Sequence, residues 1–145
     1  MDGIIVRRAR PEDSMQLAAL YDQLISKPTD VVALGNRLRE NSNIIVLVAE
    51  TGQRKLVGTV YGVICPDTVG TCQPFMTVDN LIVHADYRGR GIARSLMSVL
   101  EAIGHDAGCS LILLVSGADR RSAHRLYERL GYSVPVRGFK KYIAQ

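Results

Sequence analysis

A short basic and glycine-rich segment, residues 88–93, is the part of this chain best suited to bind a phosphate group. It reads Arg-Gly-Arg-Gly-Ile-Ala and stands between an extended apolar run at residues 78–83 and an amphipathic helical pattern that starts near Ile92. The first amides of a helix have no partner within the helix, and the helix dipole adds about half a positive charge there. Glycine lets an anion approach the backbone because it has no Cβ. The sequence therefore predicts a turn that can hold a pyrophosphate.

The spacing within this turn excludes two common phosphate-binding motifs. A P-loop needs Gly-Lys followed by Ser or Thr, which the chain lacks. A dinucleotide fingerprint needs a third glycine, where this chain has Arg94, and an acid after the next strand, where residues 111–115 offer none. Arg88, Arg90 and Arg94 add fixed positive charge around the turn. The alternatives left open are a site for another phosphate ligand and an ordinary arginine–glycine surface loop.

The positive charge of the chain gathers in clusters rather than in one tail. The net charge is +4, and much of it lies in residues 7–10, 88–94 and 120–125. A basic balance permits a nucleic-acid partner, but the sequence has no helix-turn-helix pattern and no aromatic platform. A small polyanionic ligand explains the clusters at least as well.

Length and composition indicate a globular protein. The 145 residues predict a single domain, residues 1–145, and the 47% apolar and 22% charged residues are ordinary values. No stretch approaches the roughly 20 apolar residues that span a bilayer, and the amino terminus does not resemble a signal peptide, so we expect a cytoplasmic protein without a membrane partner. The cysteines Cys65, Cys72 and Cys109 lack metal-ligand spacing, so we expect no metal.

The hydrophobic patterns predict an α/β fold of mixed type, with helices on both faces of a central mixed sheet of six to seven strands. The expected strands are residues 4–6, 44–49, 56–65, 75–84, 110–115, 132–136 and 138–143. The expected helices begin near Arg10, at Asp30, at Ile92 and at Ser122. The element order is therefore β-α-α-β-β-β-α-β-α-β-β. The nearly all-apolar run 110–115 is expected to be central and covered on both faces.

Three features resemble the GNAT superfamily of acyl-CoA-dependent N-acetyltransferases. Arg88, Gly91 and Ala93 fit its Gln/Arg-x-x-Gly-x-Gly/Ala signature. Residues 126–132, Leu-Tyr-Glu-Arg-Leu-Gly-Tyr, are similar to its Leu/Phe-Tyr-x-x-x-Gly-Phe/Tyr segment. The element order matches the superfamily from end to end, including the two helices between the first two strands. On these grounds the chain is identified as a member.

The resemblance implies how acetyl-CoA would be held. In this superfamily the strand before the turn splays from its neighbour, and its backbone binds the pantetheine arm; Leu81, Ile82 and Val83 would do so here through main-chain atoms. The pyrophosphate would lie on the turn, whose matching residues are Arg88, Gly89, Arg90, Gly91, Ile92, Ala93 and Arg94. One departure concerns Arg120, which stands where relatives often have an asparagine that contacts the CoA arm.

The resemblance also implies catalytic roles. Tyr127 would protonate the leaving thiolate as general acid, although a buried tyrosine with a bonded hydroxyl is also a common core feature. Asp79 is the candidate general base, with a loop or cap partner as the alternative. Strand alternation points Asn80 to the opposite face, so the two cannot serve one site equally unless a bulge intervenes. Many members use no dedicated base.

The expected function is transfer of an acetyl group from acetyl-CoA to a primary amine of a small molecule or peptide. The amine would attack directly in a ternary complex, because no cysteine is placed for an acyl-enzyme. The alternatives are a non-catalytic acyl-CoA-binding or regulatory module of the same fold and a basic nucleic-acid-binding domain. The sequence has no motif that identifies the amine. An exposed last strand, with the habit of the superfamily, is compatible with a homodimer.

Overall fold

The computed structural model describes residues 3–40, 43–116, 120–133 and 136–144. The chain divides into two compact units, Met1–Leu114 and Val115–Gln145, and each unit is described by itself. Parts of the expected loop 116–121 and of the expected strand 132–136 lie outside the described residues.

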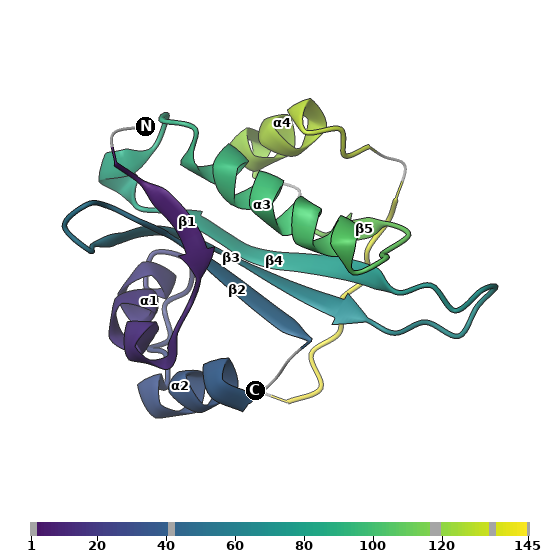
Figure 1. The fold of residues 1–145 in the computed structure, drawn as a ribbon, viewed down its shortest axis with the longest axis horizontal. Helices are drawn as coiled ribbons and strands as arrows, with labels where there is room; N and C mark the ends of the chain where they lie inside the picture. Colours follow the sequence, from purple (N-terminus) through teal and green to yellow (C-terminus); the bar gives the residue numbers. More distant parts are fainter. Residues whose placement is uncertain (1–2, 41–42, 117–119, 134–135, 145) are drawn as a thin grey trace. The chain divides into compact units, whose positions relative to one another are not determined.

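The first unit is built on a five-stranded sheet in the order β1-β2-β3-β4-β5 (Figure 1). Its strands are β1 (Ile5–Arg8), β2 (Ile44–Glu50), β3 (Leu56–Cys65), β4 (Phe75–Val83) and β5 (Ile112–Leu114). The first four strands pair antiparallel, and β5 pairs parallel to β4. The expectation of a mixed sheet is confirmed.

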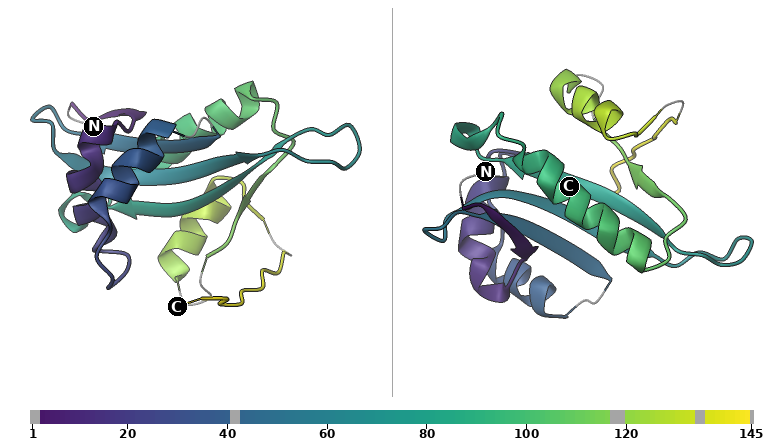
Figure 2. Two further views of the ribbon diagram at one scale, coloured as in Figure 1. Left: turned by 90° about the horizontal axis from the view of Figure 1, so that it is seen from below. Right: turned by 45° about the horizontal axis from the view of Figure 1, so that its top comes forward.

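Helices cover both faces of this sheet, as Figures 1 and 2 show. One face carries α1 (Ser14–Tyr21), which follows the short 3-10 helix η1 (Pro11–Asp13), and α2 (Val31–Glu40). The other face carries α3 (Ile92–Asp106), which follows the 3-10 helix η2 (Ala85–Tyr87). The second unit contains α4 (Arg121–Arg129). The α/β class is confirmed.

Asp30 caps α2, as its residue type predicts: its Oδ1 accepts a hydrogen bond of 2.9 Å from the Ala33 amide. None of the helices in the described part of the chain combines the length and apolar character that crossing a bilayer requires.

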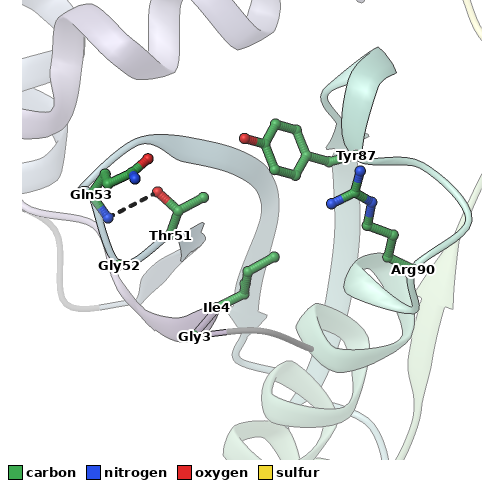
Figure 3. A pocket seen from close by; sticks show the side chains of 7 residues that line it. All are labelled: Gly3, Ile4, Thr51, Gly52, Gln53, Tyr87 and Arg90. Atoms are coloured by element: carbon green, nitrogen blue, oxygen red, sulfur yellow. Dashed lines mark hydrogen bonds between the residues drawn. The ribbon is translucent and has the colours of Figure 1, made fainter.

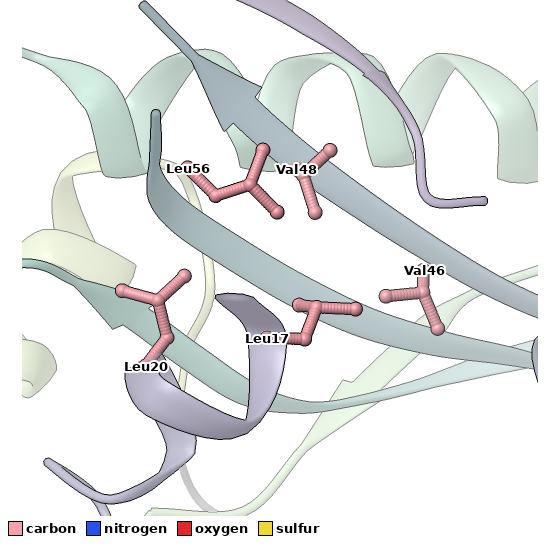
Figure 4. Packing of buried hydrophobic residues seen from close by; sticks show 5 residues of the cluster. All are labelled: Leu17, Leu20, Val46, Val48 and Leu56. Atoms are coloured by element: carbon pink, nitrogen blue, oxygen red, sulfur yellow. The ribbon is translucent and has the colours of Figure 1, made fainter. Parts of the chain in front are cut away.

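The core beneath α1 is made of aliphatic side chains from alternate strand positions. Val46 and Val48 of β2 lie on one face by the period of two and meet Leu17 and Leu20 of α1, with Leu56 of β3 beside them (Figure 4). Tyr61 packs at the edge of the same cluster.

An ion cluster joins β1, β2 and η1 at one end of the sheet. The Arg7 guanidinium donates to Asp13 at 2.8 Å and to Glu50 at 2.7 Å, with all three side chains mostly covered. Burial alone would raise the pKa of Asp13, but hydrogen bonds from Arg7 and from the Arg10 amide lower it below its ordinary value. Arg7 is therefore committed to the fold and is not a free positive charge.

The opposite face of β3 is adapted to the close approach of α3. A Cβ added at Gly58 would lie 2.9 Å from Ile92 Cγ2 and 3.1 Å from Leu96 Cδ1, and one added at Gly62 would lie 2.9 Å from Leu100 Cδ1. Ile92, Leu96 and Leu100 are buried almost completely. Two glycines four residues apart on one strand therefore let the helix pack directly on the backbone of the sheet.

Two expectations about the later strands differ from the structure. The sheet has five strands rather than six to seven, because the described residues of 132–136 and 138–143 are not in strands. β5 has only three residues and lies at the edge of the sheet of its unit, with Leu111 and Leu113 partly exposed. An apolar run shows that a segment can be buried, whereas a central position also needs a partner strand on each side.

Replacing Gly58 by valine is predicted to destabilise the protein by about 1–3 kcal/mol, because the new side chain would enter the space of Ile92 and Leu96. The Ile92 Cγ2 methyl is bonded directly to Cβ, so it cannot move away unless the whole side chain rotates. Denaturant unfolding of the purified variant measures the effect.

Gly52→Ala is the matched control, since a Cβ at Gly52 meets nothing within 4 Å. We expect it to unfold within about 0.5 kcal/mol of the original protein. An unchanged unfolding midpoint for Gly58→Val would contradict the close contact between α3 and β3.

Candidate functional site

The predicted anion-binding turn forms the connection between β4 and α3. Gly89 and Gly91 both take left-handed backbone conformations, with φ of 77° and 80°. A Cβ at either position would meet nothing within 4 Å, so the backbone there is open. The conformation, rather than a lack of space, calls for glycine at these positions.

The first amides of α3 are left without helical partners. Gly91 is the residue that precedes the helix, and no side chain caps it. The Ser95 amide donates to the Gly91 carbonyl at 3.0 Å and so begins the helical series. The amides of Ile92, Ala93 and Arg94 come before that bond, in the turn where the helix dipole is positive.

Two of the predicted arginines donate hydrogen bonds to backbone carbonyls just before the turn. Arg88 Nε donates to the Val83 carbonyl at 3.1 Å, and an Arg90 terminal nitrogen donates to the Asp86 carbonyl at 3.3 Å. The Arg90 guanidinium also lies 4.9 Å from the centre of the Tyr87 ring. Both side chains are exposed, as is Arg94, so their remaining donors face solvent. The structure thus brings the predicted residues 88–94 together in one turn.

The last residues of β4 present an unpaired backbone edge within their unit. Pairing of β4 with β5 ends at Val78 and Leu114. On the other side, the His84 amide donates to the Val57 carbonyl at 2.8 Å. Because backbone direction alternates along a strand, Leu81 and Val83 direct their main-chain groups away from β3. Ile82, the third predicted residue, directs its main-chain groups toward β3.

A β-bulge interrupts β4 at the candidate base. Thr59 of β3 faces Ile82 and Tyr61 faces Asp79, so two β4 residues, Asn80 and Leu81, lie opposite one β3 residue. Asn80 takes a left-handed conformation, with φ of 55°. The structure therefore contains the bulge without which strand alternation would point the side chains of Asp79 and Asn80 to opposite faces of the sheet.

The bulge leaves Asp79 exposed on the α1 and α2 face of the sheet. Residues directly opposite in an antiparallel pair share a face, and the partner of Asp79 is Tyr61, which packs against the core cluster beneath α1. Asp79 Oδ1 accepts a hydrogen bond of 2.8 Å from the Asn80 amide. One carboxylate oxygen is thus fixed to the local backbone. The sequence offered one signal for the bulge, since asparagine tolerates a left-handed conformation better than most residues.

Tyr127 belongs to the second unit and is described within it. It is buried on α4, with the Tyr132 ring in an edge-to-face contact at 6.1 Å between centroids. The Tyr132 amide donates to the Tyr127 carbonyl at 2.9 Å, which closes the helix. Arg120 directly precedes α4, is exposed and makes no side-chain capping bond to it.

A pocket of about 750 Å³ lies beside the turn, as Figure 3 shows. Arg90 and Tyr87 form one wall, and the chain start and the β2–β3 connection form the other. The lining residues are Gly3, Ile4, Thr51, Gly52, Gln53, Tyr87 and Arg90. The sequence did not indicate this pocket, because residues 3–4, 51–53 and 87–90 are far apart along the chain. In the described part of the chain, no group of three or more acidic, histidine or cysteine residues could hold a metal ion.

Sequence comparison relates the chain to acetyltransferases. The family model described as Acetyltransferase (GNAT) family matches residues 11–132, which include the turn and residues 126–132. An acetyltransferase of Sodalis glossinidius (strain morsitans) is 44% identical over 52 residues, a stretch that covers 36% of this chain and 37% of that protein. The match thus spans little more than a third of that relative.

Solved structures with similar folds support the α/β architecture described above. Glucosamine-6-phosphate N-acetyltransferase from Arabidopsis thaliana is 18% identical with a TM-score of 0.85, and the match covers 97% of this chain and 99% of that one. A transcriptional regulator from Bacillus halodurans C-125 is 24% identical with a TM-score of 0.87 and the same coverage. At these identities the likeness shows the fold alone. The family model, which spans most of the chain and both sequence motifs, shows that the protein belongs to the acetyltransferase (GNAT) family.

Proposed function

We propose that this protein is an acetyl-CoA-dependent N-acetyltransferase that acts on a primary amine of a small molecule or peptide. The observation that carries the proposal is the start of α3, where no side chain caps the helix and two left-handed glycines leave the backbone open. In a chain that matches this family, we expect that turn to bind the pyrophosphate of acetyl-CoA.

The cosubstrate would bind along two adjoining backbone surfaces. The pyrophosphate would accept hydrogen bonds from the first amides of α3, with Arg88, Arg90 and Arg94 supplying positive charge. The pantetheine arm would pair with the main chain of Leu81 and Val83, in the manner of an added strand. Ile82 would contribute through its position between them, since its own main-chain groups face β3.

The proposed reaction is a direct attack of the amine nitrogen on the thioester carbonyl. A new C–N bond forms, the C–S bond breaks, and the coenzyme leaves as a thiolate. The amine gives up a proton, which Asp79 would accept directly or through water, and Tyr127 would donate a proton to the thiolate. Holding both reactants in line would supply most of the rate increase.

Different observations support the proposed catalytic roles of Asp79 and Tyr127. Asp79 is exposed on the α1 and α2 face, so an amine could reach it from that side. For Tyr127 the support is its place in the family motif and its burial. A single domain, a cytoplasmic location and a homodimer stay predictions from the sequence.

Binding of CoA is the first test of the proposal, by titration calorimetry with the original protein and with Gly91→Val. We expect saturable binding with one site, and a loss of at least about tenfold in affinity for the variant, because a β-branched residue strains the left-handed turn and its methyl groups cover the amides. Gly91→Asn is the control for strain, since asparagine tolerates this conformation. Equal CoA affinity for the original protein and Gly91→Val would contradict the turn as the pyrophosphate site.

Tyr127→Phe is predicted to lower turnover by about 10²-fold, because the thiolate would leave without its proton donor. Affinity for CoA should change little, since phenylalanine keeps the ring and its contact with Tyr132. The measurement is release of free thiol from acetyl-CoA with a panel of amines. Turnover equal to that of the original protein would remove the acid role, and CoA binding without thioester cleavage for any amine would favour the non-catalytic module.

Asp79→Asn is predicted to lower kcat/KM by about tenfold near neutral pH, with a deficit that shrinks as the pH approaches the pKa of the acceptor amine, because a neutral amine needs no base before it attacks. Asp67→Asn is the matched control: its Oδ1 also accepts a bond from the next amide, at 2.7 Å, and it lies in the β3–β4 loop. A deficit that is absent, or that is independent of pH, would argue against Asp79 as the base.

A further inference from the structure

Two cations from different elements surround the Tyr87 ring beside the pocket. The Arg90 guanidinium carbon lies 4.9 Å from the ring centre, and Lys55 Nζ lies 5.4 Å from it. Lys55 directly precedes β3, whereas Arg90 belongs to the turn before α3. The aromatic ring thus holds two positive groups at a single place although they are far apart in sequence.

Among the described residues, no carboxylate forms an ion pair with either cation. None of the described residues that line the pocket carries a carboxylate. Glu50, next to the β2–β3 connection, is bonded to Arg7 at 2.7 Å. Arg90 lines the pocket, and Lys55 lies against the ring of Tyr87, which also lines it, so the pocket favours an anionic ligand.

The β2–β3 connection adds a hydroxyl donor to the same pocket. Thr51 Oγ1 accepts a hydrogen bond of 3.3 Å from the Gln53 amide (Figure 3). It accepts a second one, of 3.2 Å, from the Lys55 amide. Both bonds use the oxygen as acceptor, so the hydroxyl hydrogen is left to donate outward. Thr51 and Arg90 line the pocket and Lys55 lies on the Tyr87 ring beside them, and a hydroxyl donor with positive charge suits a phosphate group.

We propose that this pocket binds the 3′-phosphate of coenzyme A, with Lys55 and Arg90 as its cationic partners. The inference rests on the proposed function, because it takes the pyrophosphate to lie on the turn. The pyrophosphate and the 3′-phosphate of CoA are carried by one ribose, and Arg90 belongs both to the turn and to the pocket wall. A ligand seated on the turn would therefore bring its 3′-phosphate to the nearest cationic pocket. Through this pocket the protein distinguishes CoA from dephospho-CoA, which lacks the 3′-phosphate.

The experiment compares the affinities of CoA and dephospho-CoA by titration calorimetry. The original protein is expected to bind CoA about fivefold more tightly than dephospho-CoA, by an amount that falls as salt is added. Lys55→Met keeps an unbranched side chain over Tyr87 and removes the charge. It should abolish most of this preference and leave the affinity for dephospho-CoA unchanged.

Arg54→Asn is the matched control, because it removes the neighbouring exposed cation and suits the left-handed conformation of residue 54, whose φ is 63°. It should keep the preference for CoA. Equal binding of both compounds by the original protein overturns the 3′-phosphate site while the turn stands. If Lys55→Met and Arg54→Asn lose the preference for CoA to the same extent, the site is also overturned, since the preference then comes from general electrostatic attraction and not from contact with Lys55. Binding of neither compound overturns the proposed function and this inference together.

Discussion

The contact between Ile92 and Gly58 determines where the candidate site can be. Ile92 is the first residue of α3 and is almost completely buried, and its Cγ2 lies 2.9 Å from the position a Cβ would take on Gly58. The start of the helix is therefore held by the core, while the amides of the same turn remain at the surface. A rigid anchor directly beside open amides is what a preorganised anion site needs, because binding then requires little rearrangement.

The sequence predicted the parts of the fold that depend on local patterns. The bounds of β3 and the start of α3 follow from hydrophobic periodicity, and Asp30 caps α2 through a bond that its residue type favours. Gly91 could be placed before α3 because its neighbours form a motif. Membership of the acetyltransferase family could be predicted for the same reason.

Features that depend on partners distant in sequence were harder to predict. The bulge at Asn80 is defined by its register against β3, which no local pattern encodes. The expected strands of residues 132–136 and 138–143 have suitable residue types, yet Phe139, Tyr142 and Ile143 are exposed and form no ladder. The pocket beside Arg90 joins segments from three parts of the chain. Strand formation and pockets are tertiary properties, so residue types alone underdetermine them.

The distribution of charge also changes meaning once side chains are placed. Residues 7–10 contribute to the net positive charge of the sequence, but Arg7 is bonded to Asp13 and Glu50 and serves the fold. Arg88, Arg90 and Arg94 of the turn and the nearby Lys55 are exposed to solvent. A structure with bound CoA tests this account most directly. It predicts pyrophosphate oxygens at about 2.7–3.2 Å from the first amides of α3. A pyrophosphate bound elsewhere, with those amides covered by the protein's own side chains, would contradict it.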